Sequence, residues 1–292
     1  MARTISIVGA GRVGQTLARR LRQLGWRIGA VVTQSKKTSQ VAARAIGGGT
    51  PHSRLTRDAL RAEVLLITTP DGALERVARA LANFPGENYH SKIALHTSGA
   101  LDRRALAPLA RRGVSTGSLH PMQTFSGRGT PQLKGVIFAV EGDRAARRTA
   151  QAIARALGGV PVAIHGKSKP AYHAAGALVA GHGLALVEAA TRTLTGLGFS
   201  RRRALQALLP LIRQMLDNYE RLGPQAAWTG PISRGDYATI AKHGAALRRY
   251  PREFNDSYAA LSLLAARVLS KKPAATRKKL LEALKNSRGG SR

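Results

Sequence analysis

The sequence predicts an α/β domain with a doubly wound parallel sheet, followed by an all-helical domain. Three observations predict this class. Short apolar segments alternate with amphipathic segments in the first half of the chain, the first of them runs into a glycine-rich turn, and strand-like segments stop near residue 166. Such alternation is typical of a parallel sheet covered by helices on both faces. We therefore place the two domains at 1–166 and 167–292.

The elements of the first domain follow from the spacing of apolar residues. Short apolar runs predict strands at 5–8, 27–33, 64–69, 92–96, 114–119, 135–140 and 160–164. Helical spacing predicts helices at 12–24, 74–81, 101–110 and 144–157. In the first of these helices, Val13, Leu17 and Leu21 lie on one face, as packing against a sheet requires.

The second domain shows helical periodicity alone. The expected helices are at 170–197, 201–222, 236–249 and 256–269. The basic tail at 271–292 is expected to form a short helix that frays into its last residues, 287–292.

The composition is that of a globular protein and excludes several kinds of site. Of the 292 residues, 43% are hydrophobic and none is cysteine, which excludes disulfides, thiolate catalysis and cysteine-bound metals. No set of His, Asp and Glu residues has the spacing of metal ligands. No uninterrupted apolar run reaches the ~18 residues of a membrane span, and the N-terminus reads as a strand instead of a signal peptide. We expect a soluble, cytoplasmic protein with no metal and no membrane partner.

The charge is strongly basic. The net charge of +32 comes from 47 Lys and Arg against 15 Asp and Glu, scattered along the chain, and aromatic residues make up 4%. A dedicated nucleic-acid binder concentrates its charge and interleaves aromatic residues for stacking. We therefore expect a solvated basic surface that binds nucleic acid only non-specifically.

A glycine pattern connects the first strand to the first helix. Gly9, Gly11 and Gly14 form G-x-G-x-x-G, which in this position is typical of a dinucleotide-binding Rossmann domain. The first glycine permits a tight turn, the second lets the backbone approach a pyrophosphate, and the third lets the helix pack on the strand. A glycine turn without a nucleotide is the alternative. The residues expected to hold the cofactor here are Gly9, Ala10, Gly11, Arg12, Val13 and Gly14.

The end of the second strand favours NADP over NAD. NAD-preferring sites place an acidic residue there to bind the ribose hydroxyls, but the first acidic residue of this chain is Asp58. Thr69 and Pro70, at the end of strand 64–69, are expected to line the path to the ribose and nicotinamide. The residues available for a 2′-phosphate are Arg12 of the first helix and Ser35, Lys36 and Lys37 after the second strand. Thr33, at the end of that strand, is also expected to contact the cofactor.

Two loops after later strands carry candidate catalytic residues. His120 precedes a proline on a turn, and a histidine with a pKa near ~6.5 suits proton exchange during hydride transfer. A ring that only ties down its own loop is the alternative. Ser98 is expected to align the reacting substrate oxygen or, alternatively, to cap the following helix. Gln123, just after the His-Pro turn, is a candidate for substrate binding.

The helical half adds three candidates. Lys169 and His173 lie four residues apart at the start of the long helix, with His173 on an inward face. Such a pair suits the stabilisation of substrate charge, and a buried histidine satisfied by its neighbours is the alternative. Arg234 is expected to reach an anionic substrate, while Asp236 is expected to cap the next helix. The histidines expected at the surface without partners are His52, His90, His165 and His243.

Five segments together carry a resemblance to a known family. They are G-A-G-R-V-G at 9–14, H-T-S-G-A at 96–100, S-L-H-P-M-Q-T-F at 118–125, Y-H-A-A at 172–175 and T-G-P-I-S-R-G-D at 229–236. The chain resembles bacterial oxidoreductases that join an NADP-binding Rossmann domain, similar to that of deazaflavin-dependent NADP reductases, to a C-terminal helical domain of unknown function. The resemblance implies helices like those of 6-phosphogluconate dehydrogenase, a homodimer formed through them, and an active site in the cleft between domains.

More distant similarity extends to prephenate dehydrogenases, ketopantoate reductases and pyrroline-5-carboxylate reductases. Prephenate dehydrogenases have a Gly-Ser turn and a His-Pro turn, which the resemblance maps onto Ser98 with Gly99 and onto His120. Lys169 matches the lysine of a Lys-x-x-x-Asn pair found in ketopantoate reductases, but His173 stands where that pair has asparagine.

These observations predict an NADP(H)-dependent oxidoreductase that transfers hydride to or from a small carbonyl or imine compound bearing a carboxylate. Candidate substrates are 2-keto acids such as ketopantoate and cyclic imines such as pyrroline-5-carboxylate. A deazaflavin coenzyme beside NADP is the less favoured addition. The competing class is a non-catalytic NADP-binding sensor or scaffold that uses its basic surface to meet an acidic partner or nucleic acid.

Overall fold

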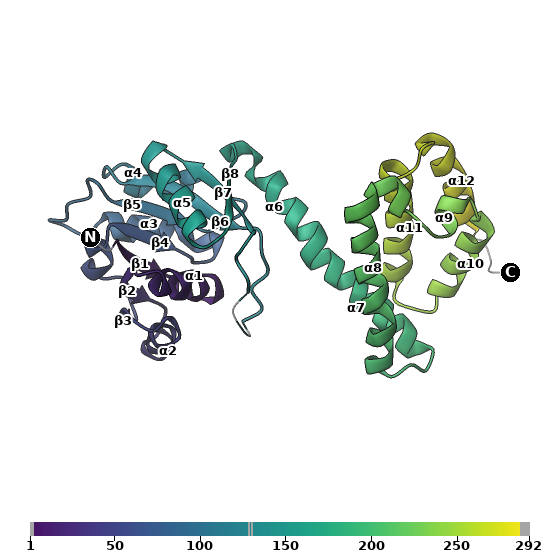
Figure 1. Ribbon diagram of the computed structural model, residues 1–292, viewed down its shortest axis with the longest axis horizontal. Coiled ribbons are helices and arrows are strands. Elements are labelled where there is room, and N and C mark those ends of the chain that lie inside the picture. Colours follow the sequence, from purple (N-terminus) through teal and green to yellow (C-terminus); the bar gives the residue numbers. More distant parts are fainter. Residues whose placement is uncertain (1–2, 128, 130, 287–292) are drawn as a thin grey trace. The chain divides into compact units, whose positions relative to one another are not determined.

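The computed structural model describes residues 3–127, 129 and 131–286. They form two compact units that divide between Gly181 and His182. Figure 1 shows the sheet and its helices in the first unit and helices alone in the second. The predicted order, an α/β domain followed by an all-helical one, is confirmed.

An eight-stranded sheet forms the centre of the first unit, with strand order β3-β2-β1-β4-β5-β6-β7-β8. Its strands are β1 Thr4–Val8, β2 Arg27–Val32, β3 Thr50–His52, β4 Val64–Ile67, β5 Ile93–His96, β6 Ser115–Pro121, β7 Ile137–Gly142 and β8 Val160–Ala163. The pairs from β3 to β6 are parallel, as is the pair of β7 and β8. The carboxyl ends of β1, β4, β5 and β6 therefore lie side by side along one edge.

The expectation of a wholly parallel sheet is wrong at one pair, because β7 runs antiparallel to β6. Among the described residues of the connection between these strands, no helix occurs. A parallel pair needs a crossover connection, usually a helix, whereas a loop suffices to join antiparallel strands.

Helices cover both faces of the sheet. Side chains of α1, α2 and α5 pack in one apolar cluster with one face, and side chains of α3 and α4 pack in a second cluster with the other. This arrangement is the predicted doubly wound fold. The helices of this unit are α1 Arg12–Gln23, α2 Lys36–Ile46, α3 Leu74–Ala82, α4 Ala107–Ala110, α5 Arg144–Ala156 and α6 Lys169–Ala177.

Three local predictions need correction. The segment expected as a helix at 101–110 is a 3₁₀ turn, Arg103–Leu106, followed by the short α4. Neither α2 nor β3 was expected. The buried face of α2 consists mainly of small residues, and β3 contains Pro51, so neither segment has a strong apolar pattern.

The strands end before residue 167, as the change in composition predicts, but the first compact unit continues to Gly181. The reason lies at the start of α6. The Lys169 side chain is fully buried and bonded to groups of two strand ends, so α6 begins as part of the sheet unit.

The second unit contains helices joined by short turns, and no strand occurs among its described residues. Its small core contains Ile240, Ala266 and Leu280, from α10, α11 and α12. The helix expected in the basic tail is confirmed as far as Asn286, while 287–292, where fraying is expected, lie outside the described residues. The helices are α7 Gly183–Gly196, α8 Arg201–Ala227, α9 Pro231–Arg234, α10 Tyr237–Leu247, α11 Arg252–Val268 and α12 Pro273–Asn286.

The expected single helix at 170–197 forms as α6 and α7 joined by a π-helical turn, Leu178–His182. The helix expected at 201–222 kinks where predicted to end, because Gly223 adopts φ 76° and ψ 172° before the chain turns helical again.

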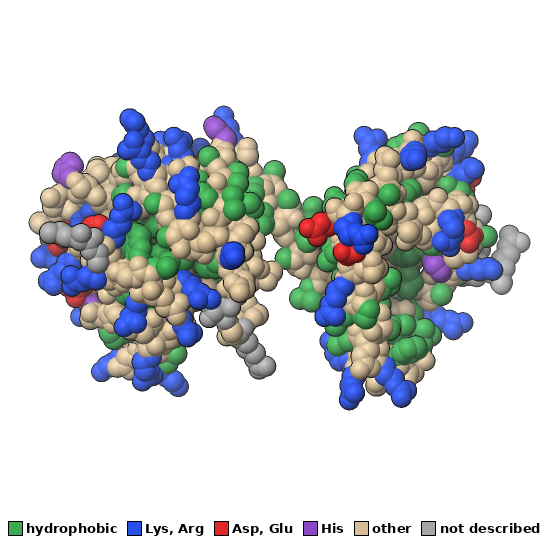
Figure 2. All heavy atoms as spheres, in the orientation of Figure 1, with side chains coloured by type: hydrophobic (Ala, Val, Ile, Leu, Met, Phe, Trp, Pro, Cys, Tyr) green, Lys and Arg blue, Asp and Glu red, His purple; other side chains and the backbone are tan. Residues whose placement is uncertain are grey.

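Apolar side chains are exposed along the helical elements. The helical stretch Gly166–Gly196 has an 18-residue window of mean hydropathy 1.3, of which 6% is buried. By length and composition alone, this stretch could cross a membrane. We did not expect this, because no uninterrupted apolar run is long enough. Core helices of soluble proteins meet the same criteria. Leu211 and Leu216 of α8 are also more than half exposed. Figure 2 shows apolar side chains on the surface of the helical unit and basic side chains scattered over both units.

Candidate functional site

The glycine turn has the geometry that its sequence predicts. Gly9 has φ +85°, and a Cβ there would collide with the backbone and side chain of Thr69. A Cβ on Gly14 would meet Thr68 and Ile7, so α1 approaches the strands closely at this point. At Gly11 the nearest atom to such a Cβ is 3.8 Å away, which leaves the turn open on that side.

Two polar side chains that the sequence analysis missed hold this turn. Thr68 Oγ1 donates to the Gly9 carbonyl oxygen over 2.7 Å, and Gln15 Nε2 donates to the Ala10 carbonyl oxygen over 2.7 Å. Thr68 directly follows a buried strand, and that position was the available signal. Nothing in the sequence distinguishes Gln15 from other polar residues on α1.

The turn presents a site suited to an anion. No side chain caps α1 at Gly11, and the first turn of this helix carries no acidic residue. The hydroxyl of Thr69 is buried beside Gly9 and has no hydrogen-bond partner among the described residues. Free amides at a helix N-terminus with an unsatisfied hydroxyl beside them fit a nucleotide diphosphate. Pro70, the next residue, is exposed at the same edge.

The end of β2 is basic and polar. Thr33 Oγ1 lies 2.6 Å from Thr38 Oγ1, and Ser35 Oγ accepts from the Thr38 amide over 3.2 Å as the N-cap of α2. Both predicted hydroxyls are therefore engaged in starting a helix that was not expected. Lys36 and Lys37 are exposed in its first turn. These two ammonium groups are the charges available for a 2′-phosphate.

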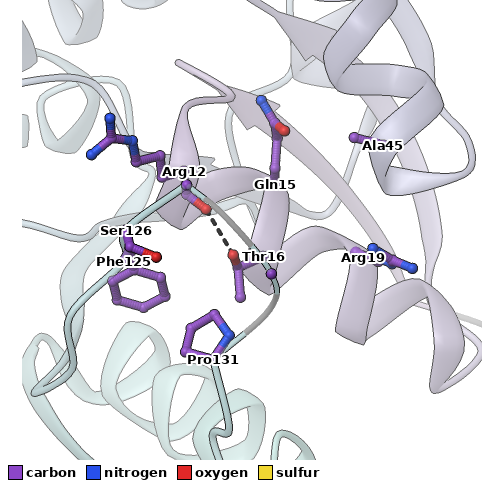
Figure 3. Close-up of a pocket in the computed structure, with 10 residues that line it drawn as sticks. Arg12, Gln15, Thr16, Arg19, Ala45, Phe125, Ser126 and Pro131 are labelled. Atoms are coloured by element: carbon purple, nitrogen blue, oxygen red, sulfur yellow. Dashed lines mark hydrogen bonds between the residues drawn. The ribbon is translucent and has the colours of Figure 1, made fainter. Parts of the chain in front are cut away.

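Arg12, a candidate for cofactor binding in the first turn of α1, also contacts the loop after β6. Its side chain packs against Gly127 of the loop after β6, where a Cβ would lie 2.8 Å from the guanidinium Nε. Arg12 and Arg19 of α1 line a pocket of about 600 Å³ with Phe125 of that loop. Figure 3 shows these three side chains. Arg12 thus contacts the β6–β7 loop from the first turn of α1.

The central feature of the site is a cluster of three aromatic rings at the end of β6. His120 Nδ1 lies 3.0 Å from Tyr172 Oη, with ring centroids 5.5 Å apart at 87°. The His173 ring is 5.7 Å from the His120 ring at 86°. Gly99 is required here, because a Cβ would collide with His173 and lie 2.8 Å from His120 Nε2. Gly99, His120, Tyr172 and His173 thus meet from three separate segments.

His120 lies within β6, opposite Ala139 of β7, and not on a turn after the strand as predicted. Burial, with the nearby charges of Lys169 and His173, lowers the pKa of His120 to about 4. The ordinary pKa assumed in the sequence analysis is therefore wrong, and the imidazole is neutral near pH 7. Burial raises the pKa of Tyr172 to about 12, so its hydroxyl is protonated. The pair consists of two neutral partners.

Ser98 is buried and its hydroxyl is fully engaged. Oγ donates to Asp71 Oδ2 over 2.8 Å and accepts from the amides of Ala100 and Leu101 at 3.2 and 2.9 Å. These contacts hold the Ser98 loop itself. The expected alternative, a cap of the following helix, is wrong, because Asp102 is the N-cap of the 3₁₀ turn that follows. A direct role on a substrate oxygen stays a prediction.

Lys169 connects α6 to two strand ends. Its Nζ donates to the Ser98 carbonyl oxygen and to Ser118 Oγ, both over 2.9 Å. Burial lowers the pKa of Lys169 to about 8, and Glu141 opposes that shift. This ammonium group stabilises the loop and places positive charge near His120. His173, by contrast, is exposed and not on an inward face as predicted, although it contacts the His120 site.

His96 was not singled out, although its segment was. It is fully buried, its Nδ1 accepts from the Ser98 amide over 3.2 Å, and its Nε2 lies 3.1 Å from the Asp102 carbonyl oxygen. Burial, followed by the charge of Lys169, lowers the pKa of His96 to about 4. A neutral His96 thus holds the Ser98 loop through these two hydrogen bonds.

Two of the remaining candidates, Gln123 and Asp236, hold local structure. Gln123 Nε2 donates to the Gln132 carbonyl oxygen over 3.3 Å, and its Oε1 accepts from the next amide. Asp236 caps α10, as expected, by accepting from the Thr239 amide over 3.1 Å. Arg234 is exposed at the end of α9 in the helical unit, and its substrate role stays a prediction.

Three histidines expected to lack partners have them, and His165 Nδ1 accepts from the Lys167 amide over 3.2 Å. His52 Nε2 lies 3.3 Å from Asp58 Oδ2, and His243 Nδ1 lies 2.8 Å from Tyr258 Oη. In both cases the partner follows later in the chain, at no spacing that would reveal it. Within the described part of the chain, no group of three or more His, Asp or Glu residues could hold a metal ion.

Comparisons with known proteins agree with this architecture. Residues 2–121 match the Rossmann-like domain, and residues 136–265 match the domain of unknown function DUF2520. The predicted combination of a Rossmann-like domain with a C-terminal domain of unknown function is therefore confirmed. Among curated proteins, none matches the chain.

Solved structures share the fold over almost the whole chain. A presumed NADP oxidoreductase from Bacteroides fragilis has a TM-score of 0.74 at 20% identity, covering 95% of this chain and 98% of its own. A 1-pyrroline-5-carboxylate reductase from Streptococcus pyogenes has a TM-score of 0.62 at 17% identity, covering 97% and 99%. A reductive aminase from Aspergillus terreus, in complex with NADPH and ethyl-5-oxohexanoate, has a TM-score of 0.63 at 18% identity, covering 100% and 97%. The sheet followed by helices is thus a fold that this chain shares with these structures.

Proposed function

We propose that this chain is an NADP(H)-dependent oxidoreductase acting on a small carbonyl or imine compound that bears a carboxylate. The observation that carries the proposal is the order β1-β4-β5-β6, which aligns the Gly9 turn, Thr69, the Ser98 loop and His120 along one carboxyl edge. Ligands of doubly wound sheets bind outside the carboxyl ends of the strands. A nucleotide site and a polar reaction site therefore adjoin on this edge.

Each part of that edge has a task in the proposed function. The uncapped start of α1 and the Thr69 hydroxyl would hold the diphosphate, and Lys36 with Lys37 would bind a 2′-phosphate. The nicotinamide, when bound, supplies or accepts the hydride. His120 would hydrogen-bond the reacting oxygen or nitrogen and pass it the Nε2 proton while Nδ1 takes the proton of the Tyr172 hydroxyl. The names of the Bacteroides and Aspergillus relatives, which mention NADP and NADPH, support the choice of cofactor.

The test is turnover in the presence of NADPH with a panel of 2-keto acids and cyclic imines. His120→Asn should abolish turnover of any substrate found. It should leave the affinity for NADPH unchanged, because His120 lies on β6 and not in the glycine turn. Gly9→Ala should lose both, because its Cβ would collide with Thr69. Turnover by His120→Asn equal to that of the wild type would refute the assigned role.

The homodimer belongs to the same proposal. Leu211 and Leu216 of α8 are exposed, and an apolar pocket of about 810 Å³ opens among α7, α8, α10 and α11 of the helical unit. A second copy of the chain would bury such a surface. Light scattering should give a dimeric mass for the wild type and a monomeric one for the double variant Leu211→Glu, Leu216→Glu. A monomeric wild type would contradict the proposal.

A further inference from the structure

The Tyr172 hydroxyl has one hydrogen-bond partner among the described residues. That partner is His120 Nδ1, which lies 3.0 Å from the phenolic oxygen. A tyrosine hydroxyl carries a single proton to donate. The phenolic proton therefore has His120 Nδ1 as its one acceptor among the described residues.

This arrangement fixes the position of the imidazole proton. A neutral imidazole that accepts at Nδ1 carries its hydrogen at Nε2. Nε2 has no hydrogen-bond partner among the described residues, and it faces the Cα of Gly99, where a side chain would fill the space in front of it. The structure thus presents an N–H donor, and not a lone pair, on the side of His120 that remains free.

We propose that Tyr172 is a positioning residue that fixes His120 as a neutral Nε2–H donor, so that the site selects a hydrogen-bond acceptor, an uncharged carbonyl oxygen or imine nitrogen, over a protonated iminium. The proposal rests on the proposed function and names the charge and hydrogen-bonding state of its substrate. An iminium cation presents an N–H donor or, when it is N-methylated, a methyl group to the Nε2–H of His120. Neither group can accept a hydrogen bond, so the Nε2–H donor is left unpaired.

The charges around His120 act in the same direction. Burial and the ammonium of Lys169 lower the pKa of His120, and the same surroundings oppose a substrate cation in contact with its ring. The carboxylates of Glu141, Asp102 and Asp71 face Lys169 and partly offset its charge. The tautomer imposed by Tyr172 is the more specific of the two effects, because it depends on one hydrogen bond.

The deciding experiment observes the tautomer directly, without substrate. The full chain, labelled with ¹⁵N-histidine, is studied at pH 7 by long-range ¹H–¹⁵N correlation, and His120 is assigned from its absence in His120→Asn. The wild type should show Nε2 protonated and Nδ1 unprotonated. Tyr172→Phe should populate both tautomers, because the phenolic donor is lost while the ring remains.

The chain supplies a matched control. His243 and Tyr258 form a similar pair in the helical unit, with Nδ1 2.8 Å from the hydroxyl and the rings 80° apart. Tyr258→Phe should leave the His120 signals unchanged. A wild-type His120 protonated at Nδ1, or an identical tautomer population in Tyr172→Phe, would overturn the proposal.

A second arm tests selectivity once a carbonyl substrate is found. Tyr172→Phe should lower kcat about tenfold or more with little change in KM for NADPH, whereas Tyr258→Phe should change neither. The wild type should turn over N-methylpyrrolinium, a cation without an acceptor, at least tenfold more slowly than the carbonyl; faster turnover of the cation would overturn the proposal. NADPH binding is measured separately. A failure to bind NADPH would contradict the proposed function, whereas the tautomer of His120 tests the role of Tyr172 independently of NADPH.

Discussion

Lowering the pH from 8 to 5 should destabilise the sheet unit through His96. This ring is fully buried between the Ser98 amide and the Asp102 carbonyl, and burial lowers its pKa from 6.5 to about 4. A histidine with a lowered pKa in the folded state binds its proton more readily when unfolded. Stability from a neutral His96 is therefore complete above pH 6.5 and is lost as the pH falls from 6.5 towards 4.

The size of the effect follows from that pKa. The full difference corresponds to about 3 kcal/mol, of which about 2 kcal/mol is already lost at pH 5. His96→Gln should be less stable than the wild type at pH 8, because one amide cannot replace both ring contacts. Its stability should then fall by about 2 kcal/mol less than that of the wild type between pH 8 and pH 5.

Urea unfolding followed by tryptophan fluorescence measures this difference in the sheet unit alone. The chain has two tryptophans, Trp26 in the sheet unit and Trp228 in the helical unit. In a Trp228→Phe background, the emission reports only on the unit that contains His96. Equal losses of stability in the wild type and in His96→Gln between the two pH values would refute the assigned pKa and its cause.

Three further predictions follow from other contacts of the site. Gly99→Ala should lower turnover at least tenfold with NADPH affinity within twofold, because its Cβ would displace the His120 and His173 rings; Gly72→Ala, where a Cβ meets open space, should change neither in the same assay. Lys169→Met should lower the unfolding free energy of the sheet unit by roughly 2–4 kcal/mol, since two buried acceptors lose their donor; a loss below 1 kcal/mol in urea would contradict this. Replacing Lys36 and Lys37 with Ala should weaken NADPH binding about tenfold and NADH binding hardly at all, measured by fluorescence titration; equal weakening of both would remove the 2′-phosphate assignment.

Most of the sheet unit was predictable because its buried strands are short runs rich in apolar residues. The segment 64–67 is an example, with all four residues of β4 buried. The direction of β7 was harder to predict, since strand patterns record burial and not direction. The lack of a helical pattern between 119 and 135 was the available signal for an antiparallel pair. Helix α2 escaped prediction because Ser39, Ala42 and Ala43 form much of its buried face.

The site was predictable in its residue types and less so in its contacts. His120, Ser98, Lys169 and His173 do meet around one strand edge. Lys169, however, bonds to groups 71 and 51 residues earlier in the chain, and those pairings arise only from the register of β5 and β6. The role of Tyr172 and the lowered pKa of His120 depend in the same way on burial and on neighbours that sequence spacing does not reveal.

Parallel fluorescence titrations of the wild type with NADPH and NADH test most directly whether the chain holds a nucleotide site that prefers NADP. The open Gly9–Gly14 turn and the exposed Lys36 and Lys37 predict NADPH binding at least tenfold tighter than NADH binding, a difference of about 1.4 kcal/mol. Equal affinities would contradict the assignment of Lys36 and Lys37 to a 2′-phosphate. Binding of neither nucleotide would contradict the account as a whole.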